Sequence, residues 1–226
     1  MIISGIKISI KKSKRKTLSI FIERDGSVTA LVPENITDDE LKEVIISKEY
    51  QIHKNLAEWK QLNDRVVHRE FVSGQSFMYL GRNYRLKLTD EKHGKLIFFK
   101  GKFLLGRDEV IKGKEYFTEF YKEKLRAKIL PIIESRQAQF GVEVRDVKVM
   151  ELQNRWASCT SSGKIHFHWK CMMAPIDVLH YIVVHELVHL THSNHTAAFW
   201  NDVDKVLPEY QKHKEWLRTH GAGMDI

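Results

Sequence analysis

Two histidines and a glutamate stand close together in the stretch Val184–Leu190, toward the end of the chain. His185 and His189 are four residues apart, and Glu186 directly follows the first of them, which gives the pattern HExxH. On an α-helix, residues four apart lie on one face, one turn from each other, so both imidazoles can bind the same metal ion. Glu186 is then close enough to accept a proton from a metal-activated water. The spacing predicts a hydrolytic metal site.

A metal site of this kind needs a third protein ligand, and two further histidines follow the motif. His192 continues the same helical face, but on a straight helix it lies about 10 Å along the axis from His185. His195 follows Ser193 and Asn194, a pair that favours the end of a helix, so the chain can turn back toward the metal there. The spacing favours His195 as the third ligand and His192 as a neighbour. Three histidines suit zinc, and they also suit other divalent ions.

The helix that carries the motif is apolar on nearly every side. Its apolar residues are Ile182, Val183, Val184, Leu187, Val188 and Leu190. Burying two histidines and a glutamate among them without partners would be unfavourable, which disfavours the alternative of two solvent-facing histidines on a surface helix. Farther along, Phe199 and Trp200 are expected to lock the loop of the third ligand onto the core. Cys159 and Cys171 are expected to pack as small apolar residues.

A second motif lies upstream, where residues 155–159 read Arg-Trp-Ala-Ser-Cys. Together with the HExxH stretch, Asn194-His195-Thr196 and Phe199-Trp200, it resembles the YgjP-like metallopeptidases, which are small relatives of the SprT-like zincins. In that family the upstream motif usually reads Arg-Trp-Gly-Ser-Cys. The basic hairpin Lys11–Val32 and the segment Gly81–Leu86 fit the family pattern as well, so the resemblance covers nearly the whole chain.

The resemblance implies a zincin-like α+β fold with zinc bound by His185, His189 and His195. It also implies that Glu186 is the general base of a hydrolase, most simply a peptidase. The expected substrate is therefore a peptide or protein. The family's natural substrates are poorly defined, so the resemblance does not name one.

Two residues are candidates for binding substrate, Arg155 and His168. Arg155 can bind an anionic or tetrahedral oxygen, and it can equally form a structural ion pair. His168 stands where relatives commonly carry Asn, and it lies in a predicted strand, Ile165–Trp169, with His166 on the same face. In zincins the strand before the active-site helix often borders the cleft and pairs with an extended peptide. A solvated strand face is the alternative. Ala157, in place of the usual Gly, tightens a turn.

The first hundred residues show the period-two alternation of β-strands. Strands at 18–22 and 28–32 with a turn at 24–27 predict a hairpin. Thr37 and Glu40 have the spacing of a capping box, which predicts the start of a helix over 38–60. Four more strands are expected, at 76–80, 84–88, 96–100 and 103–105.

From about residue 112 onward, helices and strands alternate. The pattern predicts a helix over 115–140 with Pro131 inside it and Gly141 as its cap, and strands at 142–150 and 165–169. The active-site helix opens after Ala174-Pro175. The fold class is therefore α+β, with a zincin-like core that contains the HExxH helix. We expect a β-rich basic region over 1–111 and a catalytic domain over 112–226, which can also form one compact unit.

Charge is distributed unevenly along the 226 residues. Residues 1–150 hold 30 Lys and Arg against 21 Asp and Glu, a charge of +9, whereas residues 151–226 carry −1 and nine of the 12 histidines. The basic part, including the run Lys11–Lys16, makes a nucleotide or nucleic acid a further possible partner. Solvated lysines that discourage aggregation at a strand edge are an equal alternative.

Two cysteines cannot supply a disulfide scaffold, and the first residues lack the charge order of a secretory signal. The longest apolar stretches are too short to span a bilayer. We therefore expect a soluble cytoplasmic protein with no membrane partner. The main functional hypothesis is a zinc-dependent peptidase. The alternatives are a metal-dependent nucleoside triphosphate pyrophosphohydrolase and a nucleic-acid-associated protein with a structural metal.

Overall fold

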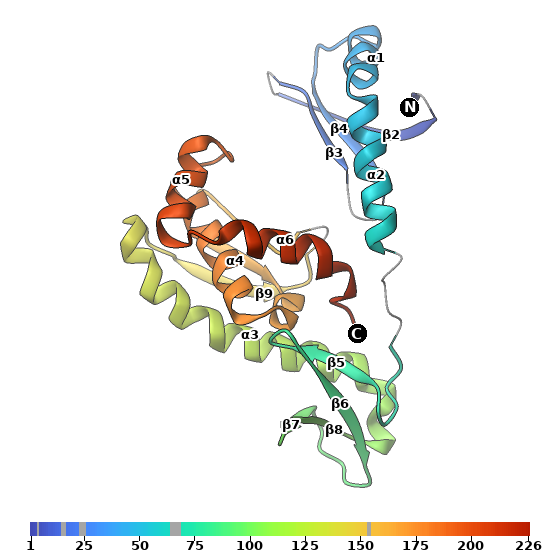
Figure 1. Ribbon diagram of the computed structural model, residues 1–226, viewed down its shortest axis with the longest axis vertical. Helices are drawn as coiled ribbons and strands as arrows, with labels where there is room; N and C mark the ends of the chain where they lie inside the picture. Colours follow the sequence, from blue (N-terminus) through green and yellow to red (C-terminus); the bar gives the residue numbers. More distant parts are fainter. Residues whose placement is uncertain (4, 15–16, 23–25, 64–68, 153–154) are drawn as a thin grey trace. The chain divides into compact units, whose positions relative to one another are not determined.

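The computed structural model consists of two compact units, residues 1–66 and residues 67–226 (Figure 1). It describes residues 1–226 apart from 4, 15–16, 23–25, 64–68 and 153–154. The second unit begins at residue 67, whereas the sequence pattern predicts a catalytic domain that begins at residue 112. The strands between residues 76 and 106 belong to the second unit because their inner side chains pack into its core: Phe77 and Phe103 both contact Phe117.

The first unit is a four-stranded sheet with two helices. Its elements are β1 (Ile2–Ile3), β2 (Ile6–Ser13), β3 (Ser19–Ile22), β4 (Val28–Pro33), α1 (Asp38–Ser47) and α2 (Glu49–Asn63). The sheet order is β1-β2-β4-β3. β3 and β4 form the predicted antiparallel hairpin, and β2 lies parallel to β4. Apolar residues of both helices, such as Leu41 and Ile52, share one buried cluster with sheet residues such as Ile8.

The predicted start of the first helix is confirmed, but its length is not. The Thr37 hydroxyl accepts the Glu40 amide at 3.3 Å, and the Glu40 carboxylate accepts the Thr37 amide at 2.9 Å. The single helix predicted over 38–60 is two helices that meet at Lys48. At this break the Ser47 hydroxyl donates to the Val44 carbonyl at 2.8 Å, so a side chain takes an acceptor that the backbone would otherwise use.

The second unit begins with another four-stranded sheet, followed by a long helix. The elements are β5 (Ser76–Tyr79), β6 (Arg82–Thr89), β7 (Ile97–Phe99), β8 (Lys102–Gly106), η1 (Arg107–Lys112), α3 (Gly113–Gln137) and η2 (Ala138–Phe140). The order β5-β6-β8-β7 has β6 parallel to β8. The four strands expected from the sequence are all present. Pro131 lies inside α3, and Gly141 takes the left-handed conformation expected of a cap, with φ of 62°.

A three-stranded sheet and three helices complete the second unit. They are β9 (Asp146–Met150), β10 (Ala157–Cys159), β11 (Lys164–His168), η3 (Trp169–Met173), α4 (Ile176–His189), α5 (Ala197–Val206), α6 (Tyr210–His220) and η4 (Gly221–Gly223). The sheet order is β10-β11-β9, so β11 is central and is hydrogen-bonded on both sides. The α+β fold class is confirmed.

Helix α4 carries the HExxH residues and packs against α3, α5, α6 and β10 (Figure 1). Its apolar residues on several sides, including Leu179, Val184 and Val188, are fully buried. This burial fixes the helix, because each apolar side chain removed from water contributes about 1.5–3 kcal/mol. Within the described part of the chain, no helix combines the length and apolar character needed to cross a membrane.

Two long-range contacts hold the surroundings of α4. At the tip of the β5–β6 hairpin, the Leu80 and Gly81 amides donate to the carbonyls of Met172 and Met173 at 3.0 and 2.8 Å, immediately before α4 begins. The Arg69 guanidinium donates to three backbone carbonyls, those of Ser76, Gly223 and Asp225, at 3.0, 3.2 and 2.6 Å. The first contact positions the start of the helix, and the second joins the beginning and the end of the unit.

Candidate metal centre

The geometry of α4 brings two imidazoles together. His185 and His189 lie one turn apart, and their Nε2 atoms are 3.1 Å from each other. His189 is the last residue of the helix. The position of both side chains therefore follows from helical spacing, and the chain is free to change direction directly after the second histidine.

The third imidazole comes from the loop between α4 and α5. The His195 Nε2 atom lies 3.0 Å from the Nε2 atoms of both His185 and His189, so three ring nitrogens form a nearly equilateral triangle. The next residue, Thr196, caps α5 by accepting the Phe199 amide at 3.4 Å. The start of α5 thus fixes the loop at the residue after His195.

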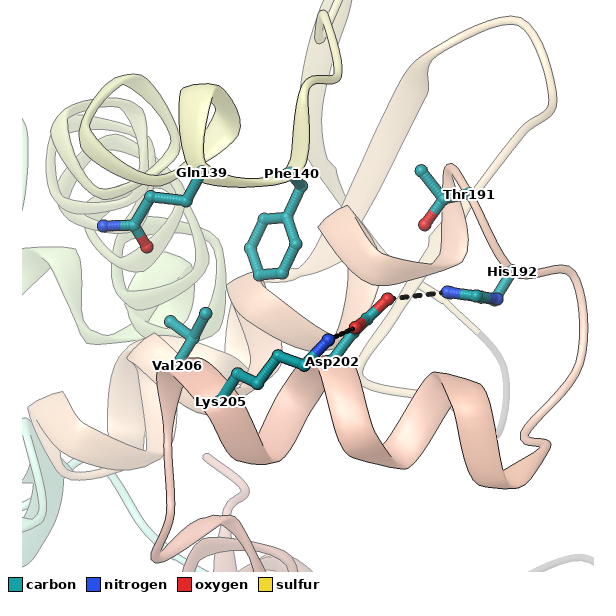
Figure 2. A pocket seen from close by; sticks show the side chains of 7 residues that line it. All are labelled: Gln139, Phe140, Thr191, His192, Asp202, Lys205 and Val206. Carbon is teal, nitrogen blue, oxygen red and sulfur yellow. Dashed lines mark hydrogen bonds and ion pairs between the residues drawn. The ribbon is translucent and has the colours of Figure 1, made fainter.

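His192 does not join this triangle. Its Nε2 atom lies 2.8 Å from Asp202 Oδ2, and Asp202 also accepts from Lys205 at 2.7 Å (Figure 2). The backbone carbonyl of His192, however, is 2.9 Å from His189 Nδ1. A carbonyl can only accept, so His189 carries its proton on Nδ1 and leaves a lone pair on Nε2, toward the other two histidines.

Aromatic side chains support the three imidazoles. The Phe199 ring is fully buried, and its centroid lies 5.0, 4.5 and 4.8 Å from those of His185, His189 and His195. Trp200 stacks on His195 at 5.4 Å. These contacts agree with the expectation that both aromatic residues hold the loop in place.

Burial keeps His185 neutral. Desolvation, reinforced by the neighbouring histidines, lowers the pKa of His185 to about 3. Its Nδ1 atom is buried and has no hydrogen-bond partner among the described residues, so packing on Phe199 orients the ring. A neutral imidazole is the form that binds a metal ion.

Glu186 is buried beside this cluster, with 6% of its surface exposed. Burial raises the pKa of its carboxyl to about 7, while the charge of Arg155 and a hydrogen bond from the Cys159 thiol oppose that rise. Both partners belong to the Arg-Trp-Ala-Ser-Cys motif, so the structure brings the two sequence motifs together. Arg155 itself is exposed to solvent.

The three histidines fit a metal ion. Bonds of 2.0–2.1 Å to imidazole nitrogens in tetrahedral geometry would separate those nitrogens by about 3.3–3.4 Å. The observed separations of 3.0–3.1 Å are within a few tenths of an ångström of that value. Nε2 lone pairs that face one another at this distance would repel one another without a cation between them. The three nitrogens could therefore serve as ligands of one divalent metal ion.

The family model for the YgjP-like metallopeptidase domain matches residues 16–220. The chain belongs to the YgjP-like metallopeptidase family. Membership makes it a metal-dependent hydrolase and implies a divalent metal, for which the three-histidine cluster offers ligands. Among solved structures, the metallopeptidase zymogen abylysin of Pyrococcus abyssi matches with 24% identity and a TM-score of 0.38 over 40% of this chain and 92% of that one. No curated protein matches.

In this member of the YgjP-like family, His168 does not belong to the cluster of three histidines. Only 5% of it is exposed. Its Nδ1 accepts the Lys170 amide at 3.1 Å, and its Nε2 lies 3.2 Å from the Glu151 carboxylate. Both ring nitrogens thus have partners within the protein, and the ring caps η3. These contacts hold the ring in place, and a substrate contact of His168 stays a prediction.

The strand expected to border the cleft also differs. The sequence predicts that β11 borders the cleft. This strand has strand partners on both sides, however, and offers no free edge for a peptide. β10 lies at the end of the sheet, packs against α4, and has one edge without a strand partner among the described residues. Strand order depends on pairing between distant segments, so the alternation pattern alone does not distinguish an edge strand from a central one.

Two residues near the YgjP-like site were not singled out from the sequence. Tyr210 stacks on Trp200 at 5.1 Å, and Lys214 lies over the same indole at 4.6 Å. The positive charge of Lys214 contributes to the lowered pKa of His195, after desolvation and the His189 ring. Both come from α6, and nothing in their local sequence indicates that α6 packs beside the loop of the third histidine.

Proposed function

We propose that this protein is a zinc-dependent peptidase with His185, His189 and His195 as the metal ligands and Glu186 as the general base. The convergence of the three Nε2 atoms carries the proposal. They lie 3.0–3.1 Å from one another, a spacing that suits three ligands of one metal ion. When bound, zinc would polarise the scissile carbonyl and make a water molecule more acidic.

The chain's own residues supply the proton transfers and the geometry. Glu186 takes a proton from the attacking water and later passes it to the leaving amine. The thiol of Cys159 and the charge of Arg155 favour the ionised form of this carboxylate and partly offset the rise in its pKa that burial causes. The carbonyl of His192 keeps the His189 ring in the tautomer that directs Nε2 inward.

The edge of β10 that has no strand partner among the described residues supports a peptide substrate. An extended peptide can add to such an edge through backbone hydrogen bonds, whatever its side chains. The thiol of Cys159, at the end of β10, forms a hydrogen bond with the Glu186 carboxylate. A peptide paired with this strand would therefore run close to the proposed general base. The family's description as metallopeptidases points to the same class of substrate.

The decisive variant is Glu186→Gln, with Glu134→Gln as the matched control. Glu134 is exposed on α3, so Glu134→Gln makes the same chemical change on another helix. We expect Glu186→Gln to keep its zinc, measured by elemental mass spectrometry, and to lose cleavage of a peptide library by about 10²–10⁴-fold. The control should keep both. Full peptide cleavage by zinc-loaded Glu186→Gln would disprove the mechanism.

The same preparations should be given a panel of nucleoside triphosphates. Phosphate release that depends on Glu186, without peptide cleavage, would replace the peptidase by a pyrophosphohydrolase. Zinc retention without turnover of either substrate class would favour a structural metal.

The ligand set is tested separately by His195→Ala and His192→Ala. The first variant removes one corner of the triangle and is expected to lose most of its zinc. The second keeps the backbone carbonyl that orients His189, so its zinc content should stay near that of the unmodified protein. Equal zinc loss in the two variants would contradict the assignment of His195.

A further inference from the structure

The sheet formed by β5–β8 has an outer face that is strongly basic. These four strands contain no Asp or Glu. Leu86 and Phe103 point inward and are buried, so the alternating Arg85, Lys87 and Lys102 point outward, and all three are exposed. One face of the sheet belongs to the core, and the opposite face presents only cations and uncharged side chains.

The strand register places these cations next to one another. Arg85 of β6 pairs with Lys102 of β8 in the parallel ladder. Like charges on directly neighbouring positions destabilise a sheet, by up to about 1 kcal/mol. Ion pairs do not offset this repulsion. Among the described residues, Arg85, Lys87 and Lys102 form no salt bridge with an Asp or Glu. The arrangement is unfavourable for the sheet alone and favourable for an anionic partner.

An exposed aromatic ring completes the same row. Phe99 of β7 pairs with Lys102, so Ser76, Arg85, Lys102 and Phe99 lie side by side across all four strands. The Phe99 side chain is 55% exposed, whereas its neighbour Phe98 packs inward on Phe103. Strands lie about 4.8 Å apart, so the row spans roughly 14 Å. Cations and an exposed ring therefore share one face of the sheet, and the Lys100 ammonium lies 5.2 Å from the centroid of that ring.

We propose that this face binds single-stranded nucleic acid, with phosphates on Arg85, Lys87 and Lys102 and a base stacked on Phe99. An acidic protein segment would be attracted by the same charges, but it has no need of an exposed ring at the end of the row. Outward-facing aromatic residues on a four-stranded sheet are a known way of stacking single-stranded bases. The proposal uses none of the residues of the metal centre and is independent of the proposed peptidase activity.

The test is binding of fluorescent 12-nucleotide RNA and DNA single strands to the full chain, followed by anisotropy at several salt concentrations. Changing Arg85, Lys87 and Lys102 to Gln should weaken binding and reduce the slope of log K against log salt by about two, since each phosphate contact contributes about 0.7. Phe99→Ala should weaken binding by about five- to a hundredfold, and Phe99→Trp should preserve it.

The matched control changes Lys11, Lys12 and Lys14 to Gln, which removes the same charge from β2 and the residue after it. These lysines are exposed and belong to the first unit. The control should bind as the unmodified protein does. Loss of binding in the control but not in the sheet variant would overturn the proposal. The proposal would also be overturned if polyglutamate displaced the fluorescent strand as well as unlabelled RNA of equal charge does. That result would identify an acidic protein as the partner.

Discussion

Replacing Gly81 by alanine tests whether the β5–β6 hairpin positions helix α4, which carries the HExxH residues. Gly81 has φ of +77°, and a Cβ atom there would lie 2.7 Å from Pro175 Cγ and 3.0 Å from Pro175 Cα. Pro175 directly precedes α4, and its ring and backbone cannot swing aside as a flexible side chain could. Alanine must therefore push the hairpin away from the start of the helix.

Gly101 supplies the matched control because its backbone conformation is similar and the space around its Cα is open. It has φ of +73°, at the tip of the β7–β8 turn of the same sheet, and a Cβ atom there meets nothing within 4 Å. Both alanine variants incur the left-handed backbone cost, about 1–2 kcal/mol. Only Gly81→Ala adds the steric conflict, which for overpacked sites costs about 1–3 kcal/mol. We expect Gly81→Ala to be the less stable variant by that second amount.

The assay is urea unfolding followed by tryptophan fluorescence, which reports mainly on the second unit because four of the five tryptophans lie in it. Gly81→Ala should also bind zinc more weakly than Gly101→Ala, since the start of α4 has moved. Equal free energies of unfolding and equal zinc affinities in the two variants would refute the reasoning.

Three further results are expected. Removing the metal with a chelator should lower the Tm, by the equivalent of about 2.7 kcal/mol when zinc was present at 100 times its Kd, and should leave the Tm of His195→Ala unchanged. Phe199→Ala should cost about 3–5 kcal/mol of unfolding free energy in urea with chelator present; a loss under 1 kcal/mol would contradict its place in the core. Burial raises the pKa of the Cys159 thiol to about 11, so alkylation followed by mass spectrometry should be slow at pH 8 and accelerate toward pH 11, and rapid reaction at pH 7 would contradict this.

Features set by local spacing could be predicted from the sequence. The pairing of His185 with His189 needs only the helical repeat, and the capping box of Thr37 and Glu40 needs only four residues. The choice of His195 over His192 followed from the same geometry, because a straight helix cannot bring three ligands to one point. The structure places these residues as the spacing indicated.

Features set by distant pairing could not be predicted in the same way. The positions of β10 at the sheet edge and β11 in its centre depend on how segments far apart in sequence hydrogen-bond. The burial of His168 follows from that central position and from Glu151, which alternation does not reveal. Strands β5 and β8 belong to the second compact unit because their apolar residues pack against α3, a contact that composition does not show.

The contacts of Arg69 with the carbonyls of Gly223 and Asp225 have a consequence for folding during synthesis. Residues 69 and 225 are separated by 156 positions. At about 5–20 residues per second, a ribosome takes roughly 10–30 s to make that stretch. The three histidines are complete before the contact can form, but the unit that holds them in place is not. For that interval the Arg69 guanidinium lacks two of its three carbonyl partners, those of Gly223 and Asp225.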